Sequence, residues 1–435
     1  MSNNPSGHNQ WGVKSYPPDE ELYEAFLQFA KEKNGAGLNE EEQLARLKTM
    51  GLNIKRGALY KLRKRLNVPS VRKATKTADK LVLEQAVIDI KSDDVLGRWG
   101  IGQVRQRLAN ANHFISRNAL REILLNQFGP EFNRRQPGFK QPDIARRPLS
   151  CLGPWHQLHV DGHEKLSKQA LRIGDDVTLP IYTMKDQFSS LSMILITAPN
   201  IRLAESCAHI YLDFVEEHQC VPITLVSDHG SEIGIMAQFQ KILRADAAPE
   251  FDEEEWPATL AVRSVHNTPA ESFWLWLRLG EGHNIRDVIL EGAARVFNSA
   301  DMLHVHVFNW LWPPLLQARL DEFQAYWNNH LIRTQREKLN TSGTSPLHAF
   351  SAPESVRSTA CNCAIKVNMN LVNELRAQIG GAEGRRAAFE FVSPEFKAMA
   401  DDVYGNLGYP SITLETAWDV FIAVVGGLRG VPLHQ

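Results

Sequence analysis

The sequence has few cysteines, no long apolar run and, over one long window, no acidic residue. Its five cysteines are scattered through 435 residues, which argues against a disulfide framework and makes a reducing intracellular location the default expectation. The segment from Met1 to Tyr16 is polar and shows no secretory signal. The longest apolar candidate, 418–427, is too short to span a membrane and contains Asp419. The sequence therefore predicts neither a secreted disulfide-rich protein nor a membrane-spanning one.

The net charge of −2 conceals a strong asymmetry along the chain. No Asp or Glu occurs from Gln43 to Ala78, and this window carries eleven basic residues: Arg46, Lys48, Lys55, Arg56, Lys61, Arg63, Lys64, Arg65, Arg72, Lys73 and Lys76. The reverse holds in 246–255, where six of the ten residues are acidic. Such a division indicates a basic nucleic-acid-binding part joined to a domain of different purpose.

The basic part is predicted to be helical. Residues 1–17 have the composition of a disordered tail. In 18–78, Asn39 with Glu42 forms a capping signal, Gly51 marks a turn, and a basic helix follows from Lys55 to Leu66. This pattern is typical of a helix-turn-helix domain. It leaves six side chains for DNA: Lys55, Arg56, Lys61, Arg63, Lys64 and Arg65. The alternative is a small helical domain with a solvated basic face, but a long acid-free run favours DNA binding.

A second helix-turn-helix-like unit is predicted in 79–128, with Ser116 as the cap of its third helix. Its arginines are expected on outer faces: Arg105, Arg107, Arg117 and Arg121. Residues 129–150 contain repeated prolines and several arginines. They are predicted to form a basic, extended linker that can follow a DNA backbone.

The hydrophobic period changes at Trp155, which indicates an α/β domain. Short apolar runs predict strands, and apolar residues at helical spacing predict helices, in the order β-β-β-α-β-α-β-α. The expected elements are strands at 155–160, 177–188, 189–198, 221–227 and 260–265, and helices at 202–218, 231–243 and 269–279. Residues 281–350 are predicted to be mostly helical, and 351–435 predict only two helices, near 371–379 and 414–425.

Three acidic residues stand at unexpected places in this domain. Asp161 and Asp228 end apolar runs, and Glu271 lies at the start of an apolar helix. Three carboxylates suffice to hold divalent metal for phosphoryl transfer. Each acid alone has an ordinary explanation, since Asp-Gly is common in turns and Glu is favourable in a first helical turn. Their combination, in this order on this fold pattern, favours a site.

The motifs around these acids resemble those of the integrase core of retroviruses, retrotransposons and related transposases. Their residues are most similar to those in integrase-core proteins of fungal mobile elements. The motifs are WHQLHVDG at 155–162, VSDHGSE at 226–232 and SVHNTPAESFW at 264–274, with YWNNH at 326–330 and GTSPL at 343–347 as a closing segment. The resemblance implies a ribonuclease H-like core at 151–350, a mixed five-stranded sheet with flanking helices, preceded by all-α units. It also implies a catalytic and metal-binding triad of Asp161, Asp228 and Glu271, two Mg²⁺ or Mn²⁺ ions per site, and DNA as partner.

The same resemblance extends to residues near the triad. Asn267 matches the Asn that commonly precedes the Glu, and Arg278, about two turns beyond Glu271, is a candidate contact to a DNA end. Position 275, which could have offered a basic residue, is Leu275. The stretch between Asp228 and Glu271 is longer than in retroviral integrases because of the acidic 246–255 segment. This insertion could gate access or reduce activity. No His-His-Cys-Cys zinc module precedes the core.

These features lead to one main hypothesis and two alternatives. The main hypothesis is a DNA-integrating enzyme of the integrase/transposase class. The alternatives are a domesticated, catalytically inactive DNA-binding regulator and a nuclease acting on RNA–DNA hybrids. By family analogy we expect at least a dimer. The basic cluster Lys61–Arg65 and DNA as partner make nuclear residence an expectation. The role of 351–435 is not readable from sequence.

Overall fold

The computed structural model describes residues 16–68, 70–71, 74–75, 80–94, 99–133, 151–163, 172–173, 177–228, 230–262, 268–334 and 341–430. Residues 1–15 of the predicted disordered tail and most of the predicted linker lie outside these residues. Among the described helices, none combines the length and apolarity needed to cross a membrane.

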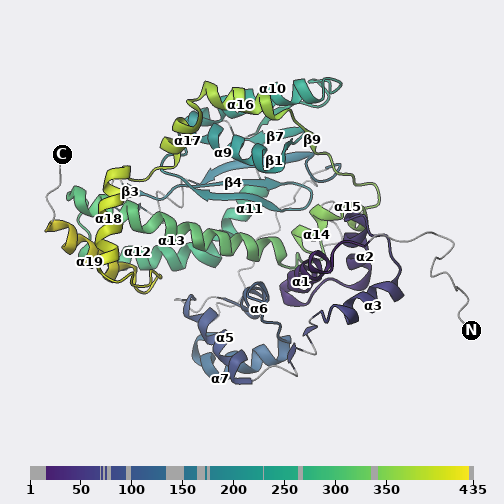
Figure 1. Cartoon of the computed structure of the whole chain (residues 1–435), viewed down its shortest axis with the longest axis horizontal. Helices are drawn as coiled ribbons and strands as arrows, with labels where there is room; N and C mark the ends of the chain where they lie inside the picture. The colour runs from purple at the N-terminus through teal and green to yellow at the C-terminus, as the bar shows by residue number, and fades with distance from the viewer. Residues whose placement is uncertain are drawn as a thin grey trace, which may run out of the picture.

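A mixed five-stranded sheet forms the centre of the molecule, with strand order β5-β4-β1-β7-β8 (Figure 1). β4 pairs antiparallel with β1 and β5, whereas β7 pairs parallel with β1 and β8. The strands are β1 (Gln157–His163), β4 (Ile181–Asp186), β5 (Ser192–Thr197), β7 (Thr224–Ser227) and β8 (Thr259–Ala261). Together with the helices between them, they follow the order that the sequence predicted.

Two of the predicted strands are shorter than their apolar runs because each contains a proline. A proline has no N–H to donate to a central ladder. The run at 177–188 divides at Pro180 into β3 (Val177–Thr178), which pairs with β2 (Arg172–Ile173), and β4. The run at 221–227 divides at Pro222 into β6 (Cys220–Val221) and β7, and β6 pairs with β9 (Ile365–Lys366).

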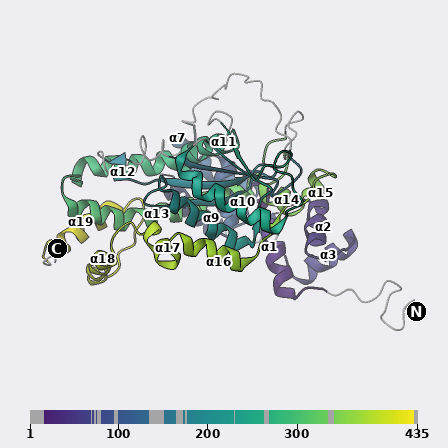
Figure 2. The same ribbon diagram turned by 90° about the horizontal axis from the view of Figure 1, so that it is seen from above.

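Helices cover both faces of the sheet, so that its central strands are buried (Figures 1 and 2). One face carries α9 (Ala204–His218), the 3₁₀ turn η1 (Ser231–Ile233), α10 (Gly234–Ala247) and α16 (Met369–Gln378). The apolar stripe of α9, Cys207, Ile210, Tyr211 and Phe214, is buried there with Leu158 and Val160 of β1. The other face carries α11 (Thr268–Leu277), α12 (His283–Val296) and α13 (Met302–Asn329). A five-residue π-helical turn, η3 (Arg278–Gly282), joins α11 to α12.

The C-terminal residues complete the hydrophobic clusters on both faces of the sheet. Helices α14 (Pro346–Ser351) and α15 (Pro353–Val356) precede β9, and α17 (Gly381–Phe389) follows α16. Helices α18 (Pro394–Asn406) and α19 (Ala417–Arg429) pack on α12 and α13, where Phe396, Val420 and Phe421 join the larger hydrophobic cluster. The sequence pattern missed α15, α17, α18 and β9.

Two helical units precede the sheet, each with its own apolar core. The first consists of α1 (Asp19–Gly35), α2 (Glu40–Thr49) and α3 (Arg56–Arg65) around Phe26, Phe29 and Leu47. The predicted cap is present, since Asn39 and Glu42 exchange hydrogen bonds with each other's backbone N–H at 2.9 Å. The second consists of α5 (Lys80–Ser92), α6 (Ile101–Asn110) and α7 (Arg117–Asn133) around Val87, Val104 and Leu120.

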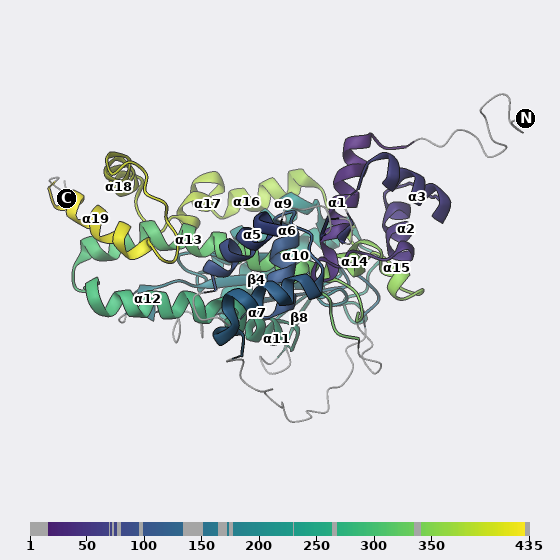
Figure 3. The same cartoon turned by 90° about the horizontal axis from the view of Figure 1, so that it is seen from below.

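The prediction that Arg107 lies on an outer face is wrong. Helix α6 packs against α13 and against α1, beneath the sheet (Figure 3), and the Arg107 side chain is 7% exposed. Its guanidinium pairs with Glu281 of η3, 174 residues along the chain. A charged side chain is buried only where it finds a partner, and that partner could not be identified from local sequence. Arg117 and Arg121 on α7 are exposed, as predicted.

Candidate active site

The parallel pairing of β1 with β7 brings Asp161 and Asp228 to neighbouring positions. Leu158 lies opposite Leu225, and His159 lies opposite Val226. Continuing this register by two residues places Asp161 opposite Asp228, which directly follows the last residue of β7. Paired positions of parallel strands present their side chains on the same face of the sheet. The register therefore directs the two residues to the same face of the sheet, and both are half-buried.

The expectation that Asp161 ends its strand needs correction. β1 continues to His163 because its antiparallel partner β4 extends that far, with Asp161 opposite Thr183 and His163 opposite Ile181. Only the pairing with β7 stops earlier, at His159. Asp161 thus lies within a strand that is still held on one side, which fixes its backbone more firmly than a strand end would.

Trp274 of α11 contacts Asp161 directly. Its indole N–H donates a hydrogen bond to Asp161 Oδ2 at 2.8 Å. Trp274 is buried, as are Ala270, Phe273 and Leu277 on the same side of the helix. Helix α11 thereby packs its apolar side against the sheet while one polar group orients the carboxylate. Partners of this kind fix the orientation of a metal ligand, and the sequence reasoning assigned Trp274 no such role.

The buried phenol of Tyr182 lies within electrostatic reach of several acids. Burial raises the pKa of Tyr182 well above its usual value, and the nearby carboxylates of Asp161, Glu232 and Asp228 raise it further. Both predicted aspartates and Glu232 therefore act electrostatically on one side chain. Glu232 lies in η1, within a motif that the sequence singled out without giving this residue a role. It is an additional acid close to the site.

Asp228 is also part of a turn. Its Oδ1 accepts a hydrogen bond from the Gly230 N–H at 3.3 Å, so the ordinary turn explanation of Asp-x-Gly holds as well. The side chain of Glu232 folds back over Gly230, where an added Cβ would lie 2.1 Å from Glu232 Oε1. An added Cβ at Gly230 would therefore displace the flexible end of Glu232, which lies over the turn that follows β7.

The third predicted acid, Glu271, lies in the first turns of α11. Its side chain is outside the described residues, as is Asn267. Arg278 is exposed at the first position of η3. Among the side chains that are described, no group of three or more His, Cys, Asp or Glu is arranged to hold a metal ion. The two described carboxylates nevertheless fit Mg²⁺ or Mn²⁺, since these hard cations prefer oxygen ligands.

The acidic 246–255 segment lies at the opposite end of the strands from Asp228. It begins in the last turn of α10 and leads toward β8, and the Ala258 carbonyl accepts a hydrogen bond from the Leu225 N–H. Glu253 pairs with the buried Arg244, which also donates to the Trp256 carbonyl. Because β7 and β8 are parallel, this segment is at their amino ends and Asp228 is at the carboxyl end. That position does not support a gate over the acids.

The basic helix α3 presents an exposed face away from the core (Figure 1). Leu59 and Leu62 are buried, as their spacing predicted, and Arg63 is half-buried. The other five predicted DNA contacts are exposed: Lys55, Arg56, Lys61, Lys64 and Arg65. Arg56 pairs with Glu40, and Arg65 pairs with Asp19 at 2.6 Å. The face is therefore accessible, and two of its six charges have an acidic neighbour.

A mixed five-stranded sheet covered on both faces, with paired acids on adjacent strands, defines a ribonuclease H-like fold. The family model described as integrase core domain matches residues 150–374, just over half of the chain. The chain belongs to this family. No curated protein matches the chain. Family membership supports polynucleotidyl transfer of the integrase or transposase type, with DNA as the bound molecule.

Proposed function

We propose that this protein integrates or transposes DNA by metal-dependent phosphoryl transfer, with Asp161, Asp228 and Glu271 as its catalytic, metal-binding triad. The observation that supports the proposal is the parallel pairing of β1 with β7, in which the last paired residues, His159 and Val226, each precede one of the two aspartates by two positions. A protein that only bound DNA would not need two carboxylates on adjacent strands, because carboxylates repel a phosphate backbone. The family match to an integrase core supports the same reaction class.

In this proposal the acids hold two Mg²⁺ or Mn²⁺ ions. When bound, such ions lower the pKa of an attacking water or 3′-hydroxyl and stabilise the leaving oxygen. Asp161 and Asp228 supply oxygen ligands from a rigid sheet, and the indole of Trp274 keeps the Asp161 carboxylate in one orientation. Glu271 contributes from α11, the helix that the same indole ties to the sheet.

The test of this activity uses supercoiled plasmid DNA with Mn²⁺. We expect nicked and strand-joined products from the intact protein, and no product when the metal is chelated. An RNA–DNA hybrid run in parallel separates integration from hybrid hydrolysis. Cleavage of the hybrid alone would assign the protein to the ribonuclease H-type reaction instead.

DNA binding is proposed for the exposed basic face of α3 and for the arginines of α7. Replacing Lys61 and Lys64 by Ala is expected to reduce the slope of log affinity against log salt by roughly 2, because each lysine that neutralises a phosphate adds about one unit to the slope. Filter binding or fluorescence anisotropy from low to moderate salt measures this slope. Lys397→Ala removes an exposed lysine of α18 as the matched control. An unchanged slope in the double variant would show that α3 does not contact phosphates.

The alternative function is a DNA-binding regulator without catalytic activity. The acidic segment gives it little support, since that segment lies away from Asp228. Position 275 on α11 could have offered a basic residue to DNA, but it is occupied by the half-buried Leu275. This difference still favours a regulator. A regulator would bind DNA through α3 and give no metal-dependent product. By analogy with the family we further propose that the active form is at least a dimer. The basic cluster Lys61–Arg65 and DNA as partner support the further proposal that it acts in the nucleus.

A further inference from the structure

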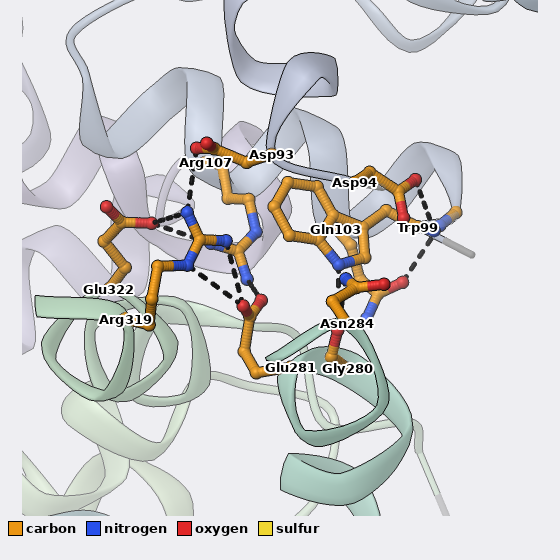
Figure 4. Close-up of polar contacts among 11 residues, drawn as sticks. Asp93, Asp94, Trp99, Gln103, Arg107, Gly280, Glu281, Asn284, Arg319 and Glu322 are labelled. Carbon is orange, nitrogen blue, oxygen red and sulfur yellow. Dashed lines mark hydrogen bonds and ion pairs between the residues drawn. The ribbon is translucent and has the colours of Figure 1, made fainter. Parts of the chain in front are cut away.

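A buried ion-pair cluster joins the second helical unit to the sheet domain (Figure 4). At its centre is Glu281 of η3, whose side chain is fully buried. One carboxylate oxygen accepts from Arg107 of α6, and the other accepts from Arg319 Nη2 of α13 at 2.9 Å. Three elements distant in sequence therefore meet at a single carboxylate.

Two further acids surround the arginines. Arg319 Nη1 lies 2.9 Å from Asp93 Oδ2 and 3.2 Å from Glu322 Oε2, and Arg107 Nη1 lies 3.4 Å from the same Glu322 oxygen. The charges of Glu281, Glu322 and Asp93 raise the pKa of Arg319 against the opposing effect of its burial. Each buried charge thus has a partner of opposite sign. A buried pair of this type is sensitive to geometry but is a weak source of stability compared with apolar packing.

Trp99 makes a second contact between the same elements. Its indole N–H donates to the Gly280 carbonyl at 3.0 Å, and the Arg107 guanidinium lies 3.8 Å from its ring centre. Asp94 accepts from the Trp99 backbone N–H at 2.8 Å and so holds the residue in place. At Gly280 an added Cβ would lie 3.3 Å from Phe323, so glycine allows the close approach. A π-helical turn departs from the usual hydrogen-bond pattern of an α-helix. Here the Gly280 carbonyl accepts hydrogen bonds from side chains.

The cluster and the acids lie along one helical segment. η3 continues directly from α11, so Glu281 lies ten residues beyond Glu271, or roughly 15 Å along the helix axis. Near its middle, α11 is tied to β1 by the hydrogen bond from Trp274 to Asp161. At its far end, the segment is tied to α6 and α13 by Glu281 and Gly280. The two attachments fix the helix that carries Glu271 at both places.

We propose that Glu281 is a positioning residue for the carboxylate site. By binding Arg107 and Arg319 together, it holds α11 in register with the sheet and couples the second helical unit to the metal ligands. This inference rests on the proposed function, because it concerns the same site. It adds a role for α6, which the sequence placed only within a second helix-turn-helix-like unit.

The test compares Mn²⁺ binding by the intact protein and by Glu281→Gln, using calorimetry on the full chain. Gln keeps the shape of Glu but removes the charge that pairs both arginines. We expect Mn²⁺ affinity to fall about fivefold or more, the lower end of typical coupling between sites. We also expect faster amide hydrogen exchange in 268–277 than in the intact protein. The control is Glu291→Gln on α12, where an exposed Glu pairs with Arg295.

A folded Glu281→Gln protein with unchanged Mn²⁺ affinity and unchanged exchange in α11 would overturn the inference. If this variant fails to fold, Glu281→Asp takes its place, because it keeps the charge but shortens the side chain, so that one carboxylate no longer reaches both arginines. The same two measurements apply to it, with the same expected and opposing results. Absence of Mn²⁺ binding by the intact protein would contradict the proposed function instead, and the exchange measurement would still decide whether Glu281 positions α11.

Discussion

Asp228→Asn is expected to abolish metal-dependent nicking and joining of DNA. The substitution keeps the size of the side chain and its turn hydrogen bond from Gly230, but it removes the negative charge beside Asp161. Bound metal contributes several kcal/mol of transition-state stabilisation, so we expect a rate loss of at least about 10³-fold. The plasmid assay under Mn²⁺ measures it, at matched DNA occupancy.

Asp246→Asn is the matched control for this substitution. Asp246 is an exposed acid on α10 and belongs to the segment at the amino ends of β7 and β8. It should retain full activity. Full activity of Asp228→Asn would exclude the proposed mechanism, whereas loss of activity in both variants would indicate a general effect of acidic charge.

The second large effect concerns the pH dependence of stability at the contact between the first helical unit and α14. His348 of α14 is 1% exposed. Burial, followed by the charge of Arg46, lowers its pKa from 6.5 to about 4. Between pH 6.5 and about 4, the His348 imidazole is largely protonated in the unfolded state but neutral in the folded state. The unfolded state therefore binds more protons in this range. Stability attributable to His348 is therefore lost as pH falls from 6.5 to about 4, by about 3 kcal/mol in total.

We expect His348→Gln to flatten this loss, as measured by urea unfolding at pH values between roughly 7 and 4. Two buried acids titrate with the opposite sign, since burial raises the pKa of Asp186 to about 6 and that of Glu32 above its usual value. These two contributions are present in both proteins, so they cancel when the pH profile of the variant is subtracted from that of the intact protein. His113→Gln, at a half-buried histidine after α6, serves as control. An identical pH profile for His348→Gln and the intact protein would contradict this assignment.

The sheet and two of its acids could be predicted because their signals are local. Apolar runs, proline positions and helical spacing determine strands such as β7 and helices such as α9, and their order along the chain matched the structure. Asp161 and Asp228 stood out because a charged residue followed each apolar run. The extent of β1 could not be predicted, because it depends on where β4 begins, after Pro180.

Other features depend on partners that are distant in sequence. Arg107 resembles a surface arginine until Glu281 and Arg319 are placed around it. Trp274 resembles an ordinary core aromatic, because nothing near it in sequence shows that its N–H meets Asp161. The C-terminal helix α18 gives a weak pattern alone, since its apolar residues become a core only against α13 and α19.

The most direct test of the metal site is Mn²⁺ binding to the intact protein and to the double variant Asp161→Asn/Asp228→Asn. Isothermal titration calorimetry, with and without duplex DNA, measures both. If the two carboxylates on β1 and β7 form a metal site, the intact protein binds Mn²⁺ and the double variant, folded to the same extent, does not. Equal binding by both proteins, or no binding by the intact protein even with DNA, would contradict the central claim that these acids are the metal ligands.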